Sequence, residues 1–371
     1  MTTLYLIRHT QAEGNLYRAM QGQWDGDITP IGLKQIGKLS EKMKDVKIDK
    51  VYSSDLYRAY ITAKLGIADR RGLPVEKDCR LREINVGEWE TKFFGNVFHD
   101  EPESAKFFMF DSENWSGKAA ETFPQVRDRM YAAIEDIAKK NDGKTVALVS
   151  HGVSLRCFLS KVYGVNLSDI ETVPICKNTA ITKVEYENGK FNVIFKNDFS
   201  HLGEYNPPKW NSTGDVRDVV LNPYLEGDYY TRCYEEGWTF AHEGSLEGFD
   251  PSLYLAFART HYEDYEGSVL RLLLEDKDIG LLDMDTERGK EDNTGWISFI
   301  YLNPEYRGKG YGVQALGRAV MTYKIMGRDA LRLNVNKKNK TAIAFYSKNE
   351  FKTIGEDGDL LLLEKSLHNL V

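Results

Sequence analysis

The sequence predicts two α/β domains on one chain, each a sheet with helices packed against it. Short apolar runs alternate with amphipathic segments, as in strands connected through helices. The chain has 371 residues, whereas a single domain usually holds about 100–150. The segment 203–214 has no periodicity and is rich in turn-forming residues. We therefore expect domains at 1–205 and 215–371, with a linker at 206–214.

The first domain is expected to begin with a buried strand and to alternate between helices and strands in a mainly parallel sheet. Thr3–Arg8 is an apolar run that ends in a charged residue. A helix should start after Thr29, a good cap, because Pro30 fits a first helical turn; it should end near Asp45. The other elements expected are strands at 50–53 and 145–150, helices at 55–65, 124–140 and 154–163, and a hairpin of 181–187 and 190–196 around Asn188-Gly189.

The second domain is expected to open with helices from about Leu221 to Tyr265, a region dense in tyrosine and acidic residues. Apolar runs and helical periodicity then alternate up to the end of the chain. The elements expected are strands at 268–274, 278–283 and 295–302, a helix at 311–326, a strand at 330–335, a helix at 339–349 and a strand at 360–364.

Composition excludes several classes of protein. The net charge is −7 and the sequence pI is about 5.7, which disfavours general binding of nucleic acid or anionic membranes. The four cysteines are far apart and form no CxxC pair, so we expect neither a metal site nor disulfides. No apolar stretch approaches the roughly 20 residues of a membrane span. A strand from residue 4 leaves no secretory signal, so we expect a cytoplasmic location.

Imidazole and charged side chains lie at or near the junctions between predicted strands and loops. They are Arg8, His9, Arg58, Glu83 and His151. Parallel strands bring their carboxyl ends to one edge of a sheet, where open α/β sheets bind ligands. Two histidines, two arginines and a carboxylate at that edge are what phosphoryl transfer through a phosphohistidine requires.

Each of these residues alone has an ordinary structural interpretation, but their joint occurrence favours a catalytic site. His9 would be the nucleophile. Arg8, Arg58 and His151 would stabilise the charge on the transferring group. Glu83 would protonate the leaving oxygen and then activate water.

Residues 1–202 resemble the histidine phosphatase superfamily, also called the phosphoglycerate mutase-like family. The shared motifs are Arg8-His9, Glu13-Gly14-Asn15, Ser53-Ser54-Asp55, Arg58, Leu81–Trp89 and Ser150-His151-Gly152. The resemblance implies a three-layer αβα sandwich, a small phosphomonoester as substrate, and no cofactor. By position it implies His9 as the phosphohistidine, a phosphate pocket of Arg8, Asn15, Arg58 and His151, Gln21 as a further phosphate contact, and Glu83 as the proton donor.

Two features of this first domain leave alternatives open, and a third departs from the family pattern. Leu81–Glu90 resembles the phosphatase branch, so we favour hydrolysis, with a phosphoglycerate mutase-like phosphomutase as the alternative. Thr10 stands where a small residue is common, and we expect it to tighten the pocket. The aromatic stretch Phe93–Trp115 is either a hydrophobic lid over the substrate or ordinary helical packing.

A glycine-rich turn at 306–312 marks a second site. It follows an apolar strand and precedes a helix, so its backbone N–H groups can approach a pyrophosphate. No GK[ST] follows the glycines, and GxGxxG is absent, so neither a P-loop nor a dinucleotide fingerprint is present.

Residues 302–312 and 339–346 resemble motifs of the GCN5-related N-acetyltransferase (GNAT) family, and the resemblance covers about 215–371. It implies a mixed α/β GNAT fold that uses acetyl-CoA to acetylate an amine, here unidentified. Tyr346 would be the general acid that protonates the departing thiolate. The residues implied in cofactor binding are Ile300, Leu302, Arg307, Gly308, Lys309, Gly310, Tyr311, Gly312 and Asn339.

The base of this second site is open. No carboxylate lies on 295–302, where some relatives carry one, so Asp283, Asp285 or a water relay is expected to remove the proton. The acidic region 229–266 either lines the acceptor side, which would suit a cationic amine, or is a solvated face. A non-catalytic acyl-CoA-binding or regulatory role of the second domain is the alternative to acetyl transfer.

Overall fold

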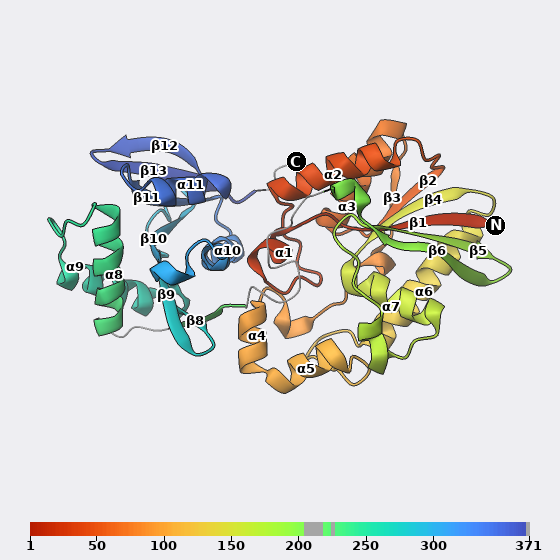
Figure 1. The fold of residues 1–371 in the computed structure, drawn as a ribbon, viewed down its shortest axis with the longest axis horizontal. Coiled ribbons are helices and arrows are strands. Elements are labelled where there is room, and N and C mark those ends of the chain that lie inside the picture. The colour runs from red at the N-terminus through yellow and green to blue at the C-terminus, as the bar shows by residue number, and fades with distance from the viewer. Residues whose placement is uncertain (204–217, 224–226, 369–371) are drawn as a thin grey trace. The chain divides into compact units, whose positions relative to one another are not determined.

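The computed structural model describes residues 1–203, 218–223 and 227–368. The predicted linker at 206–214 lies outside the described residues. The chain forms two compact units, Met1–Asn206 and Pro207–Asn369 (Figure 1). No helix among the described residues is long and apolar enough to cross a membrane.

The first unit is built on a six-stranded sheet in the order β3-β2-β4-β1-β5-β6. Four neighbouring strands, from β3 to β1, run parallel, and the hairpin of β5 and β6 adds antiparallel to β1. The parallel strands therefore end at the same edge. Their bounds are β1 Thr2–Arg8, β2 Lys50–Ser53, β3 Val75–Lys77, β4 Thr145–Ser150, β5 Ile181–Glu187 and β6 Lys190–Asp198.

Helices cover both faces of this sheet, so the predicted three-layer αβα sandwich is confirmed. Leu4 and Leu6 of β1 belong to the core that contains the apolar residues of α6 and α7. Ile7 of the same strand belongs to the core that contains α2 and α3, as period-two alternation in a strand requires. The helices are α1 Glu13–Tyr17, α2 Pro30–Met43, α3 Tyr57–Ala63, α4 Phe94–Asp100, α5 Pro102–Phe110, α6 Phe123–Lys140 and α7 Gly152–Tyr163.

Side-chain caps set the starts of the two long helices. Thr29 Oγ1 accepts a hydrogen bond from the Gly32 amide at 3.0 Å, with Pro30 in the first turn of α2. Thr122 and Gln125 form a reciprocal capping box before α6. These caps place the helices where their apolar faces meet the sheet.

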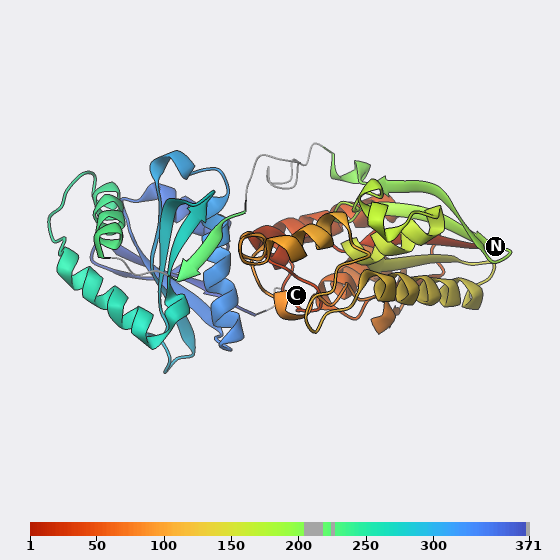
Figure 2. The ribbon, with the colours of Figure 1, turned by 90° about the horizontal axis from the view of Figure 1, so that it is seen from below.

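The second unit holds a seven-stranded sheet in the order β12-β13-β11-β10-β9-β8-β7. Figure 2 shows α8 and α9 on one face of this sheet and α10 on the other. This is the mixed α/β arrangement that we predicted. The bounds are β7 Val220–Pro223, α8 Gly227–Ala241, α9 Pro251–Asp264, β8 Val269–Leu274, β9 Lys277–Asp285, β10 Thr294–Leu302, α10 Tyr311–Ile325, β11 Ala330–Asn336, α11 Lys340–Lys348, β12 Lys352–Asp357 and β13 Leu360–Ser366.

The central strands of the second sheet separate along their length. β10 pairs with β11 in parallel only from Thr294 to Trp296. Beyond that point β10 carries a bulge between Ile297 and Phe299 and remains paired with β9 alone. One edge of β10 therefore faces no described strand along its last residues, which leaves its backbone open to an extended ligand.

Several elements differ from the sequence expectation. Leu221 was expected to be helical, but it lies in strand β7 and pairs with Leu272 of β8. Strand β12 was not predicted, because most of its residues are exposed and no alternation marks it. The short strand β3 and the helices α1, α4 and α5 were not predicted either.

Candidate functional site

His9 and His151 meet at the edge where β1 and β4 end. The two strands pair in parallel up to Arg8 and Ser150, and the His9 amide donates to the Ser150 carbonyl at 2.9 Å. The centroids of the two imidazole rings lie 5.1 Å apart. Both rings are buried, so neighbouring parallel strands bring two histidines to one enclosed point.

The tautomer of His9 is fixed by its neighbour. His9 Nδ1 lies 2.6 Å from the carbonyl oxygen of Thr10. A carbonyl can only accept, so Nδ1 carries the proton and Nε2 holds the free lone pair. Burial, together with the charges of Arg58 and Arg8, holds the pKa of His9 well below 6.5. His9 is therefore a neutral imidazole with Nε2 available as nucleophile.

Two guanidinium groups are close enough to these rings to act on them electrostatically. Arg8 Nη1 donates to the Cys176 carbonyl at 2.6 Å. Arg58, on α3, is 1% exposed, and burial lowers its pKa to about 10 even though nearby carboxylates oppose the change. Both side chains remain cationic at neutral pH, and their charge depresses the pKa of His9 and of His151.

Several buried donors of this site have no partner among the described residues. Since a buried N–H without a partner costs about 1–3 kcal/mol, such a cluster indicates a place prepared for an anion with several acceptor oxygens. The donor atoms are Nε of Arg8, Nε of Arg58, Nε2 of Gln21 and the one protonated ring nitrogen of His151, neither of whose ring nitrogens has a partner.

Two amide side chains are oriented so that their NH₂ groups can donate. Asn15 Oδ1 accepts from the Ala12 amide at 3.1 Å and from Asn178 Nδ2 at 3.3 Å. Gln21 Oε1 accepts from the Gly14 amide at 3.1 Å. With both carbonyl oxygens engaged, the amide nitrogens are the ends that can bind an oxyanion.

Glu83 is held at the amino terminus of α7. Its Oε2 accepts from the Val153 amide at 3.0 Å, and its Oε1 accepts from the Ser154 amide at 2.8 Å. The Ser154 hydroxyl lies 3.0 Å from the same Oε1. The charge of Glu83 also acts on Arg8 and Arg58. The carboxyl group is therefore fixed beside the two arginines, 8% exposed.

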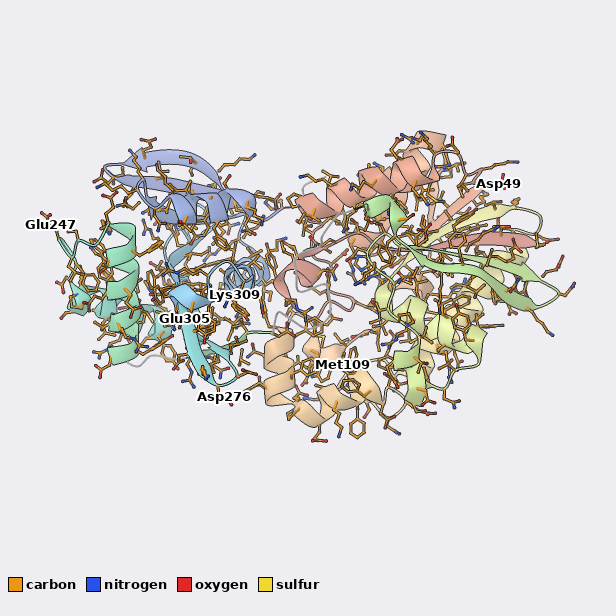
Figure 3. The ribbon with its side chains drawn as sticks, in the orientation of Figure 1. Asp49, Met109, Glu247, Asp276, Glu305 and Lys309 are labelled. Carbon is orange, nitrogen blue, oxygen red and sulfur yellow. The ribbon has the colours of Figure 1, made fainter. Side chains whose placement is uncertain are left out.

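The second unit presents a glycine-rich loop at the start of α10, and Figure 3 labels Lys309 on it and Glu305 just before it. Gly308 and Gly310 have φ of +71° and +93°, a conformation that glycine adopts without strain. Gly310 is the N-cap of α10, so the amides after it lack helical partners. Arg307 instead folds back, with Nε donating to the Leu302 carbonyl at 2.8 Å.

Two further predicted residues of this unit, Tyr346 and Asn339, lie in different surroundings. Tyr346 is 8% exposed and packs between Phe345 and Phe351. Burial raises the pKa of its phenol, so it stays protonated at neutral pH, as a general acid must. Asn339 caps α11, because its Oδ1 accepts from the Ala342 amide at 3.0 Å.

Comparison with known proteins assigns a family to each of the two units. The family model described as histidine phosphatase superfamily (branch 1) matches residues 4–198, just over half of the chain. The chain belongs to the histidine phosphatase superfamily. The model of the acetyltransferase (GNAT) family matches residues 228–351. The chain thus carries a histidine phosphatase domain and a GNAT domain, and both predicted resemblances are confirmed.

Individual relatives match the histidine phosphatase domain over nearly their whole length. Phosphoserine phosphatase 1 of Hydrogenobacter thermophilus is 32% identical over 55% of this chain and 96% of its own. A probable phosphoglycerate mutase GpmB of Yersinia pestis is 32% identical over 50% of this chain and 86% of its own. The solved structure of Bacillus stearothermophilus YhfR superposes with a TM-score of 0.53 at 31% identity, covering 54% of this chain and 100% of that one.

The structure corrects one expectation about the histidine phosphatase domain and decides between two alternatives for another segment. The Thr10 hydroxyl donates to the Gly32 carbonyl at 2.6 Å, so it points to α2 and does not tighten the pocket. Phe108 and Trp115 pack with their ring centroids 4.9 Å apart, in a core that includes Trp89. Ordinary packing therefore accounts for the inner aromatic residues of the segment 93–115.

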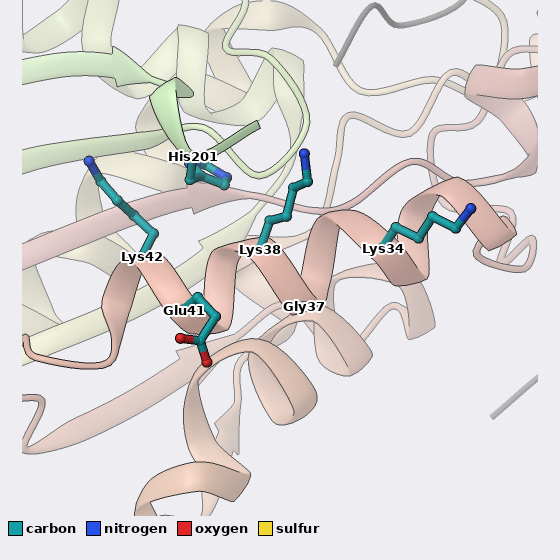
Figure 4. Close-up of a pocket in the computed structure, with 6 residues that line it drawn as sticks. All are labelled: Lys34, Gly37, Lys38, Glu41, Lys42 and His201. Atoms are coloured by element: carbon teal, nitrogen blue, oxygen red, sulfur yellow. The ribbon is translucent and has the colours of Figure 1, made fainter. Parts of the chain in front are cut away.

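A surface hollow on α2 lies outside this site and contains none of its residues (Figure 4). Lys38 Nζ donates to the Leu202 carbonyl at 2.8 Å, and Lys42 Nζ donates to Ser200 Oγ at 3.1 Å. The lysines thus fasten the turn Ser200–Leu202 to the helix. The hollow is lined by Lys34, Gly37, Lys38, Glu41, Lys42 and His201.

Sequence reasoning missed residues that act through backbone groups. Asn178 Nδ2 donates to the His9 carbonyl at 2.9 Å and to Asn15 Oδ1, so it links the nucleophile to the pocket. The Cys176 carbonyl holds Arg8. No residue type marks such contacts in a sequence, although the clustering of Cys176 and Asn178 just before strand β5 is a weak positional signal.

In the GNAT domain, a buried charged cluster lies between α9 and β9. His261 Nδ1 is 2.7 Å from Asp283 Oδ1, and its Nε2 is 3.4 Å from Asp285 Oδ2. The Tyr230 hydroxyl donates to the other oxygen of Asp283. Asp283 is fully buried with both oxygens engaged. It is therefore a poor candidate for the base. Asp285 is engaged as well, because its Oδ1 accepts from the Glu287 and Arg288 amides at 3.1 and 2.9 Å, so the contacts favour a water relay.

We expect the contribution of this cluster to the free energy of unfolding to fall as the pH rises from about 6.5 to above 9. Burial lowers the pKa of His261, but hydrogen bonds to Asp283 and Asp285 outweigh burial and raise it to about 9, from 6.5. The folded state holds the proton more tightly, so the stabilisation is complete below about pH 6.5 and is lost as the pH rises through about 9. At about 1.4 kcal/mol per tenfold change, the difference corresponds to about 3 kcal/mol.

Hydrogen exchange followed by mass spectrometry measures this loss in peptides of β9, after correction for intrinsic rates. His261→Gln should remove the dependence on pH, and His242→Gln, a second histidine of the domain, should keep it. The same pH dependence in His261→Gln and in the wild type would contradict the assignment.

Proposed function

We propose that the first domain hydrolyses phosphomonoesters through a phosphohistidine at His9. The neutral Nε2 of His9, beside a cluster of buried donors without partners, is the observation that carries this proposal. The arginines supply positive charge that a metal supplies in other phosphatases. A screen of phosphomonoesters with release of inorganic phosphate as readout tests it.

The residues have complementary roles in two half-reactions. His9 Nε2 attacks phosphorus, and the P–O bond to the leaving group breaks as the P–N bond forms. Glu83 gives its proton to the leaving oxygen. Water then attacks the phosphohistidine and loses a proton to Glu83, which releases phosphate and returns His9 to its neutral state. Arg8, Arg58 and His151 hold the phosphoryl oxygens in both steps.

A phosphomutase is the second candidate, because relatives called phosphoserine phosphatase and probable phosphoglycerate mutase are equally similar in identity. The two reactions share the phosphohistidine and differ in the acceptor. Phosphoserine and 3-phosphoglycerate therefore belong in the screen. Release of inorganic phosphate supports hydrolysis, whereas exchange of the phosphoryl group between phosphoglycerates supports a mutase.

We expect Glu83→Gln to separate substrates by their leaving groups. For alkyl phosphates kcat/KM should fall by about 10²–10⁴-fold, because the leaving alkoxide loses its proton donor. For p-nitrophenyl phosphate kcat/KM should fall much less, since its leaving group needs little protonation. The second half-reaction should still slow, so rapid mixing should show a burst of nitrophenol before slow turnover.

The control is Glu88→Gln, at an exposed residue paired with Lys118, which should behave like the wild type. An equal loss of kcat/KM for both classes of ester would show that Glu83 only supports the pocket.

For the second domain we propose acetyl-CoA-dependent transfer to an amine. The loop Arg307–Gly312 and the first turn of α10 suit a pyrophosphate, and the unpaired edge of β10 at Ile300 and Leu302 suits an extended arm. When bound, acetyl-CoA supplies an activated acetyl thioester. Tyr346 holds the proton that a thiolate would take up, and Asn339 orients the start of α11 through its cap.

A regulatory acyl-CoA-binding role remains the second candidate for this domain, because Asp283 is not free to act as a base. Calorimetry with acetyl-CoA and a screen of amines for release of free thiol distinguish the two. Binding without transfer to any amine would favour regulation. We also propose the domain boundaries at 205 and 215.

A further inference from the structure

The carboxylate of Glu90 gathers the amides of a loop that is distant in sequence. Its Oε2 accepts from Gly22 at 3.1 Å and from Trp24 at 3.0 Å. Its Oε1 accepts from Gln23 at 2.7 Å and from Val86 at 3.4 Å. Hydrogen bonds to an ionised acceptor are about twice as strong as neutral ones, so this one side chain fixes the conformation of three successive residues.

The same loop turns its carbonyl groups to Arg58. Arg58 Nη1 donates to the Trp24 carbonyl at 3.0 Å. Its Nη2 donates to the Gly22 carbonyl at 2.6 Å and to the Gln21 carbonyl at 3.3 Å. The guanidinium is thus held by its two terminal nitrogens, and the charge of Glu90 is among those that act on it. Its buried Nε has no partner among the described residues.

The contact between the loop and Glu90 is close enough to require glycine at position 22. A Cβ on Gly22 would lie 2.4 Å from Glu90 Oε1 and 2.3 Å from the Ile84 carbonyl oxygen. Side chains do not fit at such distances, so the backbone of the loop lies directly on the carboxylate.

We propose that Glu90 is a positioning residue of the phosphatase site. It orders the loop 21–24, whose carbonyls aim the guanidinium of Arg58 at the phosphoryl group. The inference rests on the proposed phosphatase function, and neither the family resemblance nor the comparisons give Glu90 a role. It acts on phosphate binding through Arg58 and leaves proton transfer by Glu83 unchanged.

Glu90→Gln in the full chain tests this role, because the amide keeps the size but replaces one acceptor oxygen with a donor. We expect inhibition by orthovanadate and kcat/KM for p-nitrophenyl phosphate to weaken together by about 10–100-fold, less than the roughly 10²–10³-fold for complete removal of an oxyanion donor. The leaving-group dependence of kcat/KM should stay that of the wild type. Glu88→Gln, two positions earlier and exposed, is the matched control and should match the wild type in all three readouts.

A double-mutant cycle separates positioning from general support of the fold. In an Arg58→Met background, Glu90→Gln should lower kcat/KM by less than about twofold, because the group it positions is gone. The same fold-loss in both backgrounds, or unchanged vanadate inhibition in the single variant, would overturn the proposal. If Glu90→Gln does not fold, Glu90→Asp takes its place with the same readouts. Its shorter side chain moves both carboxylate oxygens away from the loop amides.

The wild type separates this inference from the function beneath it. A wild-type chain that neither hydrolyses the ester nor binds vanadate would overturn the phosphatase function and the role of Glu90 with it. An active wild type with an unaltered Glu90→Gln variant would overturn the role of Glu90 alone.

Discussion

His9→Ala should abolish hydrolysis of aryl and alkyl phosphates, with a loss on the order of 10⁴–10⁶-fold in kcat, as when other enzymes lose a covalent nucleophile. The physical reason is that the variant has no nucleophile at the position of His9 Nε2. His151 is the other imidazole at the site, and its ring centroid lies 5.1 Å from that of His9. Steady-state release of phosphate measures the effect.

The fold should survive this change. The side chain of His9 contacts the Thr10 carbonyl through Nδ1, and no strand pairing depends on the imidazole. Circular dichroism of the variant should therefore match the wild type. His99→Ala, at an exposed histidine on α4, is the matched control and should retain full activity. Wild-type turnover in His9→Ala would exclude the phosphohistidine route.

Gly310→Glu should abolish binding of acetyl-CoA, with a loss of affinity of at least about 100-fold by calorimetry. Gly310 has φ of +93°, where a residue with a Cβ is strained by about 1–2 kcal/mol. The new carboxylate would also stand at the amino terminus of α10 and compete with the pyrophosphate for the same amides. Strain and charge both act against the ligand.

Gly327→Glu is the matched control for this variant. Gly327 has φ of +72° and lies just past the other end of α10, in open space. The Gly327→Glu variant has the same new charge and a similar backbone strain, but both lie away from the loop. Acetyl-CoA binding should therefore persist. Tight binding by Gly310→Glu would refute the cofactor site.

The sequence predicted the parts of the site that depend on residue type and strand order. Arg8 ends one strand, and His9 and His151 directly follow two strands that lie side by side. Their approach could therefore be predicted from the alternation of apolar runs and helices. Arg58 and Glu83 lie in the loops and helix starts at the same edge. The structure brings all five together, and their catalytic roles remain predictions.

What could not be predicted depends on backbone groups in irregular segments. The tautomer of His9 comes from the Thr10 carbonyl, and the hold on Arg58 comes from carbonyls of the loop at 21–24. A sequence does not show where such groups point. Strand β12 escaped prediction for a related reason, because an exposed edge strand has no apolar alternation to reveal it.

The position of a trapped phosphoryl group tests the central claim most directly. The wild type is mixed rapidly with p-nitrophenyl phosphate, quenched in alkali to preserve phosphohistidine, and digested for mass spectrometry and phosphorus NMR. We predict an acid-labile phosphoryl group on Nε2 of His9, at a higher level in Glu83→Gln, because Nδ1 is committed to the Thr10 carbonyl. A phosphoryl group on Nδ1 of His9 or on His151, or a burst of product with no phosphorylated histidine, would contradict the account.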